Sequence, residues 1–269
     1  MPNTNNSMSD VFTPLDGKNV GSQLDQKYDY GSHASNAHRT FFDTKHSRHV
    51  LWGSVGGVCK GSDWANMMSF PRVVELDPLD SSRLISFPLP EISTLWANTS
   101  TISQSFEVVV GATHRLPSSF GGNQLDLTFG FEANASASRT FGVRVLAPPG
   151  TEATRGVNVT VNTTAGSAFA TLGGGAVNPV SRTDFRVLGN TVDLRILVDH
   201  AIVEIFAEGG RTTATAWLCA PLEAIGVEIF NLGPSTLVVK EVASHAVASV
   251  NQMPWELAAT GVALKNERE

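Results

Sequence analysis

An aspartate next to a histidine, Asp199-His200, is the pair in this chain that most invites a catalytic role. A histidine oriented by an aspartate can take a proton from a serine or cysteine nucleophile. No serine or cysteine near this pair lies in a recognisable nucleophile elbow. The pair also separates two apolar runs, as the turn of a hairpin does. We therefore expect His200 to be a structural turn residue.

Histidines and tryptophans near the start of the chain are the other candidates for chemistry. The histidines lack the i, i+4 placement of a helical zinc site, and we expect no metal and no cofactor; they are His33, His38, His46 and His49. Trp52 and Trp64 could stack on a sugar ring, but we expect both to pack inside a sheet.

The elements that must position these residues are β-strands. Apolar residues alternate with polar ones from Val192 to Val198, and the same two-residue period continues through Ile202, Glu204 and Phe206. Gly209-Gly210 then predicts a tight turn into a third strand within residues 212–218. The pattern predicts an antiparallel sheet.

Further alternating runs indicate two groups of strands. Short strands are expected at 40–42, 50–52 and 73–76, and the proline-rich segment 87–96 predicts a linker with a short helix. Beyond it, three runs of apolar residues each share one face of an expected strand; they are Leu125, Leu127, Phe129 and Phe131, then Phe141, Val143 and Val145, then Val157, Val159 and Val161. Short strands punctuated by Gly and Pro are typical of a two-sheet β-sandwich.

Composition and charge exclude several classes of partner. The chain has 269 residues and a formal charge of −6, so it lacks the basic face that nucleic acid requires. No apolar run approaches the roughly 20 residues of a membrane helix. The first ten residues are polar and contain no signal peptide, so we expect the true N-terminus to lie upstream.

The cysteines and possible glycosylation sites bear on the compartment. Cys59 and Cys219 are far apart and show no metal spacing; two buried free thiols are the favoured interpretation, with a disulfide as the alternative. Five Asn-x-Ser/Thr sequons occur, at Asn5, Asn98, Asn134, Asn158 and Asn162. Four of them within one predicted sandwich fit a protein of the secretory route.

Five stretches, in order, resemble one enzyme family. They are Tyr28-Asp-Tyr-Gly31, Thr40-Phe-Phe-Asp43, Val50-Leu-Trp-Gly53, Ser69-Phe-Pro-Arg72 and the run Val198-Asp-His-Ala-Ile-Val-Glu-Ile-Phe-Ala-Glu-Gly-Gly-Arg211. The pattern is similar to the C-terminal part of glycoside hydrolase family 32, the plant-type invertases, β-fructofuranosidases and fructosyltransferases.

The resemblance implies an all-β fold. It predicts the last portion of a five-bladed β-propeller at residues 1–95, an antiparallel β-sandwich at 100–250 and a tail at 251–269. It also implies an extracellular or vacuolar parent protein that acts on sucrose or fructan. Phe41, Phe42, Leu51, Trp52, Met67, Met68 and Phe70 should then be partly exposed, because most of the propeller is not in this chain.

The catalytic carboxylates of the family are not found. Its retaining mechanism uses a nucleophile in N-D-P-N-G, a stabilising Asp in R-D-P and an acid/base Glu in a W-E-C-P-like motif, and none of these occurs here. Asp77-Pro78 lacks the preceding Arg and reads as a turn, and Trp255-Glu256 lies out of order in the tail. We therefore predict no catalytic residue in this chain.

Asp29 is the residue to which the resemblance gives a role at the sugar, with Tyr30 beside it. An ionised carboxylate can accept bonds from two sugar hydroxyls, which suits the recognition of a polyol. The residue after Gly31 is Ser32, where relatives often have Lys. The alternative for Asp29 is a surface turn.

The sequence thus predicts the C-terminal part of a β-fructofuranosidase-like protein that is inactive by itself. The alternatives are a lectin-like carbohydrate-binding or regulatory sandwich, and a small subunit that completes a propeller with a separate N-terminal half or large subunit.

Overall fold

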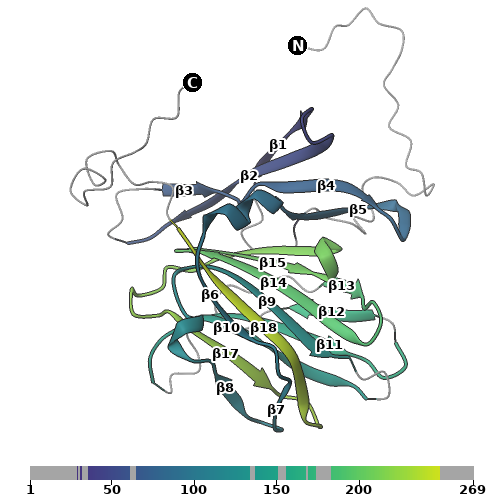
Figure 1. The fold of residues 1–269 in the computed structure, drawn as a ribbon, viewed down its shortest axis with the longest axis vertical. Helices are drawn as coiled ribbons and strands as arrows, with labels where there is room; N and C mark the ends of the chain where they lie inside the picture. The colour runs from purple at the N-terminus through teal and green to yellow at the C-terminus, as the bar shows by residue number, and fades with distance from the viewer. Residues whose placement is uncertain are drawn as a thin grey trace, which may run out of the picture.

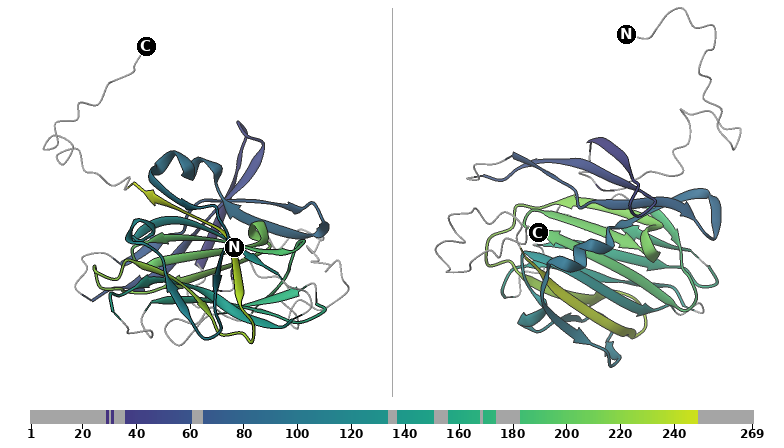
Figure 2. Two further views of the ribbon diagram at one scale, coloured as in Figure 1. Left: turned by 60° about the horizontal axis from the view of Figure 1, so that its bottom comes forward. Right: turned by 45° about the horizontal axis from the view of Figure 1, so that its top comes forward.

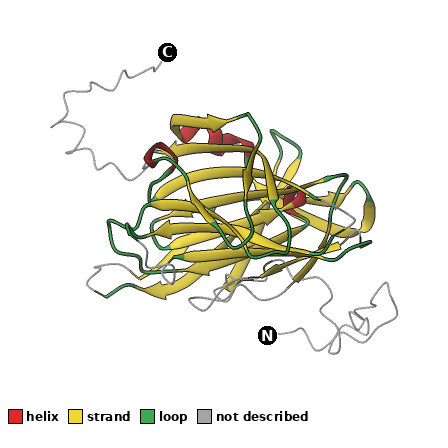
Figure 3. Ribbon diagram, turned by 90° about the horizontal axis from the view of Figure 1, so that it is seen from below, coloured by secondary structure: helices red, strands yellow, loops and turns green. Residues whose placement is uncertain are grey.

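The computed structural model describes Asp29, Gly31 and residues 36–60, 65–133, 137–150, 156–167, 169–173 and 183–248. These residues form three antiparallel sheets with a few short 3₁₀ turns, so the predicted all-β fold is confirmed (Figure 1; Figure 3). In the described part of the chain, no helix has the length and apolar character needed to cross a bilayer.

The N-terminal sheet has the order β1-β2-β4-β5, with β3 also paired to β2. Its strands are β1 (Asn36–Asp43), β2 (Arg48–Val58), β3 (Ala65–Met68), β4 (Arg72–Asp77) and β5 (Asp80–Pro88). The sequence pattern predicted three of these strands. It did not predict β5, because Asp77-Pro78 closes a hairpin into β5 and does not lead into a linker.

A 3₁₀ helix, η1 (Pro90–Leu95), follows β5 and confirms the short helix expected within the proline-rich segment 87–96. The chain then enters the sandwich through β6 (Trp96–Ile102). Its six-stranded sheet has the order β13-β12-β11-β10-β17-β8, and its seven-stranded sheet has the order β16-β15-β14-β9-β18-β6, with β7 also paired to β18.

The remaining strands of the sandwich are β7 (Phe106–Val108), β8 (Thr113–Arg115), β9 (Gln124–Glu132), β10 (Arg139–Ala147), β11 (Val157–Thr163), β12 (Phe169–Gly173), β13 (Thr183–Arg186), β14 (Thr191–Asp199), β15 (Ile202–Ala207), β16 (Thr212–Trp217), β17 (Gly226–Asn231) and β18 (Leu237–Val247). Two further 3₁₀ turns are η2 (Ser118–Phe120) and η3 (Glu208–Gly210).

The sandwich core is built from the alternating residues that the sequence singled out. The three apolar runs in β9, β10 and β11 are all buried in one cluster with the inner faces of β14 and β15. Burying these side chains removes their apolar surface from water, which is the main force that holds the two sheets together.

The hairpin β14–β15 is confirmed, and its turn contains the Asp199-His200 pair. His200 adopts a left-handed backbone conformation (φ 52°), and its N–H donates to the carbonyl of Asn123 at 2.6 Å. His200 and Asp199 bond each other at 2.8 Å on the surface, as two turn side chains do.

The N-terminal sheet packs on one side of the sandwich, next to β14 and β15 (Figure 2). Two apolar clusters lie between them. One contains Val55, Ala201, Ile202 and Trp217, and the other contains Ile92, Leu197 and Phe206. All six residues of β15 are therefore buried, because one face of the strand packs in the sandwich and the other against the N-terminal sheet.

Candidate functional site

A buried ionic cluster joins the N-terminal sheet to the sandwich. It consists of Asp29, Arg72, Glu204 and Thr215, and we refer to it as the Arg72 clamp. Nε and Nη2 of Arg72 donate to one carboxylate oxygen of Glu204 at 2.9 and 2.5 Å. The Arg72 guanidinium also lies over the Phe206 ring, 5.0 Å from its centroid.

Asp29 completes the clamp from the other side. Its carboxylate accepts bonds from Arg72 Nη2 at 3.0 Å, Thr215 Oγ1 at 2.5 Å, and the N–H groups of Thr215 and Gly31 at 2.8 Å each. The Asp29 side chain is 1% exposed. Four donors on one buried carboxylate satisfy its oxygens and fix its orientation.

Two carboxylates share one guanidinium in this cluster. Although burial opposes the charge, the carboxylates of Glu204 and Asp29 raise the pKa of Arg72, so the guanidinium stays charged. Glu204 also accepts the N–H of Phe70 at 2.6 Å. The clamp therefore ties together Asp29 and Gly31, the start of β4 and the strands β15 and β16.

The substrate role predicted for Asp29 and Tyr30 stays a prediction. Asp29 faces Arg72 and Thr215 inside the protein, and Tyr30 lies outside the described residues. Sequence reasoning missed Arg72 and Glu204. The sequence did contain a signal for Glu204, because Glu204 shares the two-residue period of the apolar Ile202 and Phe206. A carboxylate on such a buried face requires a charged or hydrogen-bonding partner.

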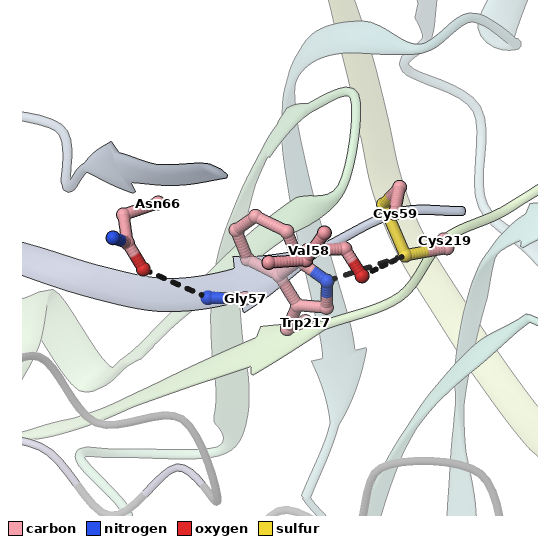
Figure 4. Close-up of a disulfide and its surroundings, with 6 residues drawn as sticks. All are labelled: Gly57, Val58, Cys59, Asn66, Trp217 and Cys219. Carbon is pink, nitrogen blue, oxygen red and sulfur yellow. Dashed lines mark hydrogen bonds between the residues drawn. A yellow bond between two sulfur atoms is a disulfide. The ribbon is translucent and has the colours of Figure 1, made fainter. Parts of the chain in front are cut away.

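A disulfide between Cys59 and Cys219 is a second link between the two parts (Figure 4). The favoured prediction of two free thiols is wrong, because the fold brings the end of β2 to the loop after β16, with the two Cα atoms 5.4 Å apart. Trp217 Nε1 donates to Cys219 Sγ at 3.4 Å. A Cβ on Gly57 would lie 2.2 Å from the Trp217 ring, so only glycine allows this approach.

A third link is the ion pair of Arg211 and Asp77. Arg211 Nη2 bonds Asp77 at 2.7 Å, and Nη1 donates to the carbonyl of Glu208 at 2.8 Å. The Glu208 carboxylate in turn accepts the N–H groups of Leu188 and Asp193 at 3.1 Å each. Burial raises the pKa of Glu208 to about 7.

A cleft of about 470 Å³ lies between the end of β5 and the outer face of the seven-stranded sheet. Phe87, Pro88 and Phe206 form its apolar wall, and Thr128, Asp193 and Arg195 are among its polar groups. Arg195 is held in place by two bonds to the buried Asp126, at 2.9 and 2.7 Å. Such a mixture of aromatic and fixed polar groups suits a polyol ligand.

The outer part of the N-terminal sheet leaves large apolar side chains in solvent. Phe41 is 50% exposed, Phe42 51%, Trp52 41% and Met68 60%, which confirms the prediction for these four residues. The separate expectation that Trp52 packs inside a sheet is wrong. The prediction is wrong for Leu51, which is buried inside the sheet. The rings of Phe41 and Trp52 lie 5.9 Å apart on adjacent strands and form one patch.

Other candidates from the sequence do not assemble into a site. Asp77 caps its own turn by accepting the N–H of Leu79, as expected for that turn, and Trp255-Glu256 lies outside the described residues. Among the residues that the structure describes, no group of three or more His, Cys, Asp or Glu side chains is arranged to hold a metal ion.

Comparisons with known proteins agree with this architecture. Residues 91–247 match the family model described as "Glycosyl hydrolases family 32 C terminal". Sucrose:sucrose 1-fructosyltransferase of Festuca arundinacea is 32% identical over 87% of this chain and 41% of its own length. A vacuolar acid β-fructofuranosidase of a Rosa hybrid cultivar is 32% identical over 74% of this chain and 37% of its own.

The solved structures that match show the same fold. Fructan 1-exohydrolase IIa from Cichorium intybus superposes with a TM-score of 0.73 at 23% identity, covering 88% of this chain and 52% of that chain. Exo-inulinase from Aspergillus awamori superposes with a TM-score of 0.62 at 21% identity, covering 82% of this chain and 44% of that chain. The chain thus spans less than half the length of these curated relatives and about half of the first of these structures.

Proposed function

The chain belongs to family 32 of the glycoside hydrolases, and from this premise we propose that it is the C-terminal part of a β-fructofuranosidase-like protein. The complete protein would hydrolyse sucrose or fructans, or transfer fructosyl units. Relatives named for each kind of chemistry support this substrate class, and a point variant of the Cichorium enzyme has been solved in complex with 1-kestose.

The observation that carries the proposal is the contrast between the two faces of the N-terminal sheet. One face is joined to the sandwich by the Arg72 clamp, the disulfide and two apolar clusters. The other presents Phe41, Trp52 and Met68 to solvent. A propeller blade has this character when its neighbouring blades are not in the chain, because blades bury their apolar faces against each other.

We infer that residues 1–95 contribute the last portion of a propeller, residues 100–250 the sandwich, and 251–269 a tail. A retaining glycosidase needs two carboxyl groups about 5–5.5 Å apart on either side of the bond it cleaves. Asp29 and Glu204 cannot serve, because both carboxylates are buried and bonded to Arg72. The chain by itself is therefore proposed to be inactive.

The proposed parent protein passes through the secretory route to a vacuolar or extracellular site. A disulfide that links two parts of the fold persists in oxidising compartments, and three of the Asn-x-Ser/Thr sequons lie on described strands of the sandwich. One of the relatives is named as vacuolar.

The test compares the chain alone with the chain co-expressed with the propeller half of a family 32 enzyme. We expect no fructose release from sucrose, inulin or 1-kestose by the chain alone. Co-purification with the propeller half, abolished by Phe41→Ser and Trp52→Ser together, would support the assignment. Turnover by the chain alone above that of a boiled control would overturn the inactivity.

A second candidate function is the binding of carbohydrate without catalysis, which the cleft beside Phe87 and Arg195 favours. Titration calorimetry with inulin-type oligosaccharides on the chain alone would detect it. Loss of that binding in Arg195→Met, with an unchanged melting temperature, would support it, whereas no heat of binding at millimolar oligosaccharide would exclude it.

A further inference from the structure

The four edges of the sandwich differ in how they are protected against pairing with another strand. An unpaired edge strand is a template for aggregation, and proteins usually block it with charge, proline, short length or a covering element. In the six-stranded sheet both edges are short and charged: β8 has three residues and includes Arg115, and β13 has four and includes Asp184 and Arg186.

The seven-stranded sheet protects only one of its edges in these ways. All six residues of β16 are buried, and the strand lies next to β5 and is followed by the disulfide. The opposite edge is β6, with seven residues, Trp-Ala-Asn-Thr-Ser-Thr-Ile, of which none is charged and none is proline. Within the described part of the chain, β6 pairs with β18 on one side and with no strand on the other.

Asn98 lies near the middle of this edge and begins the sequon Asn98-Thr99-Ser100. Its side chain is exposed, and it stands opposite Ala246 of β18. Asn158 and Asn162 also begin sequons, but they are half-buried on β11 inside a sheet, where their Oδ1 atoms accept bonds from Arg144 at 2.7 Å and Thr140 at 2.8 Å. Asn5 and Asn134 lie outside the described residues.

We propose that Asn98 carries an N-linked glycan and that this glycan protects the β6 edge of the seven-stranded sheet. The donor is an oligosaccharide carried on a lipid diphosphate. A bond forms between Nδ2 of Asn98 and C1 of the first sugar, the bond from C1 to the lipid diphosphate breaks, and the diphosphate leaves while the amide gives up one proton. The inference rests on the secretory route proposed above.

The glycan would act by bulk and hydration. The glycan at Asn98 would block strand pairing at β6, as charged residues do at β8 and β13 and as the N-terminal sheet does at β16. A second strand could not approach the β6 edge without displacing the glycan. The edge sequence is otherwise rich in β-branched residues, which favour strand pairing.

The experiment expresses the full chain with a secretion signal in a eukaryotic host, together with the propeller half. Mass spectrometry of the peptide that contains Asn98 should show the glycan on most molecules. Asn98→Gln should raise the aggregated fraction in size-exclusion chromatography several-fold. Asn98→Lys, which restores protection by charge without a glycan, should return it to the wild-type level.

Asn158→Gln is the matched control and should leave aggregation unchanged. Trimming the glycans of the folded wild type with an endoglycosidase should reproduce the effect of Asn98→Gln, which separates edge protection from a folding defect. All variants share the same N-terminal sheet, so its exposed face contributes equally to each.

An unmodified Asn98 in a chain whose other sequons are modified would overturn the proposal, as would Asn98→Gln or trimmed protein that stays as monomeric as the wild type. Neither result bears on fructosidase activity or on co-purification with the propeller half. Failure here is thus distinguishable from failure of the proposed function.

Discussion

Arg72 of β4 and Glu204 of β15 lie 132 positions apart in the sequence, yet two nitrogens of the guanidinium bond the same carboxylate oxygen inside the protein. Both side chains are removed from water where the N-terminal sheet meets the sandwich. This pair makes the attachment of the two parts specific, because Glu204 without Arg72 would be a buried carboxylate that has lost its cation.

Replacing Arg72 with Met should destabilise the chain by about 3–5 kcal/mol, since Glu204 and Asp29 would remain buried without their cation. Adding Glu204→Met should recover part of the loss, so the double variant is more stable than the sum of the single changes predicts. Urea unfolding followed by fluorescence measures this; strictly additive losses would show that the pair is not coupled.

Stability should depend on pH through Glu208. Burial raises the pKa of its carboxyl to about 7 in the folded chain, so the fold retains a proton that the unfolded chain releases near pH 4.5. Its contribution is therefore fully present below pH 4.5 and is lost as pH rises towards 7, by up to about 3 kcal/mol.

The measurement for Glu208 is the difference in unfolding free energy between wild type and Glu208→Gln from pH 4 to pH 8. We expect the wild type to lose stability relative to the variant as pH rises. Glu107→Gln, at an exposed position of β7, is the matched control and should show a constant difference. A constant difference for Glu208→Gln as well would contradict the assignment.

Removing the disulfide should loosen the attachment of β2 to the sandwich. The bond closes a loop of 160 residues, and loss of such a link typically costs about 2–5 kcal/mol. Cys59→Ser with Cys219→Ser should lower the melting temperature and speed tryptic cleavage at the adjacent, exposed Lys60. A reductant should have the same effect on the wild type and none on the double variant.

A charged substitution should have different effects on the two faces of β15. Val203 lies in the sandwich core, so Val203→Asp should unfold the chain, because a carboxylate without a partner is costly there. Phe206 faces the N-terminal sheet beside Arg72 and Glu204, so Phe206→Asp should free that sheet first.

Hydrogen exchange separates the two outcomes for β15. In Phe206→Asp, residues 36–88 should exchange quickly while β9 and β14 stay protected. Leu222→Asp, at an exposed loop position, should change neither region. Equal loss of protection in both regions of Phe206→Asp would mean that the two parts unfold as one unit.

Sequence patterns predicted those parts of the fold that repeat locally. Alternation identified β9, β10, β11, β14 and β15, because each buries one face on the core over several residues, and the Gly209-Gly210 turn indicated β16. It missed β5, where the apolar Leu84, Ile85 and Phe87 follow a polar turn and end in proline. It placed the sandwich after residue 100 and so missed most of β6, whose exposed edge has no buried periodicity.

The contacts between the two parts could not be predicted in the same way. The Arg72–Glu204 pair and the disulfide join residues more than 130 positions apart, and no local pattern specifies which distant residue will meet which. The cysteine spacing left a disulfide and free thiols both open, and only the fold decides between them. The position of Glu204 among apolar residues indicated that it has a charged partner, but it did not indicate that the partner is Arg72.

Because β15 is buried on both faces, the sandwich is not a module that can be exchanged freely between relatives. A chimera that joined this N-terminal sheet to a foreign sandwich would have to bring a carboxylate to the position of Glu204 and an aromatic ring to that of Phe206. Recombination between family members should therefore succeed when its crossover points keep β4 and β15 from the same parent, and fail when they come from different ones.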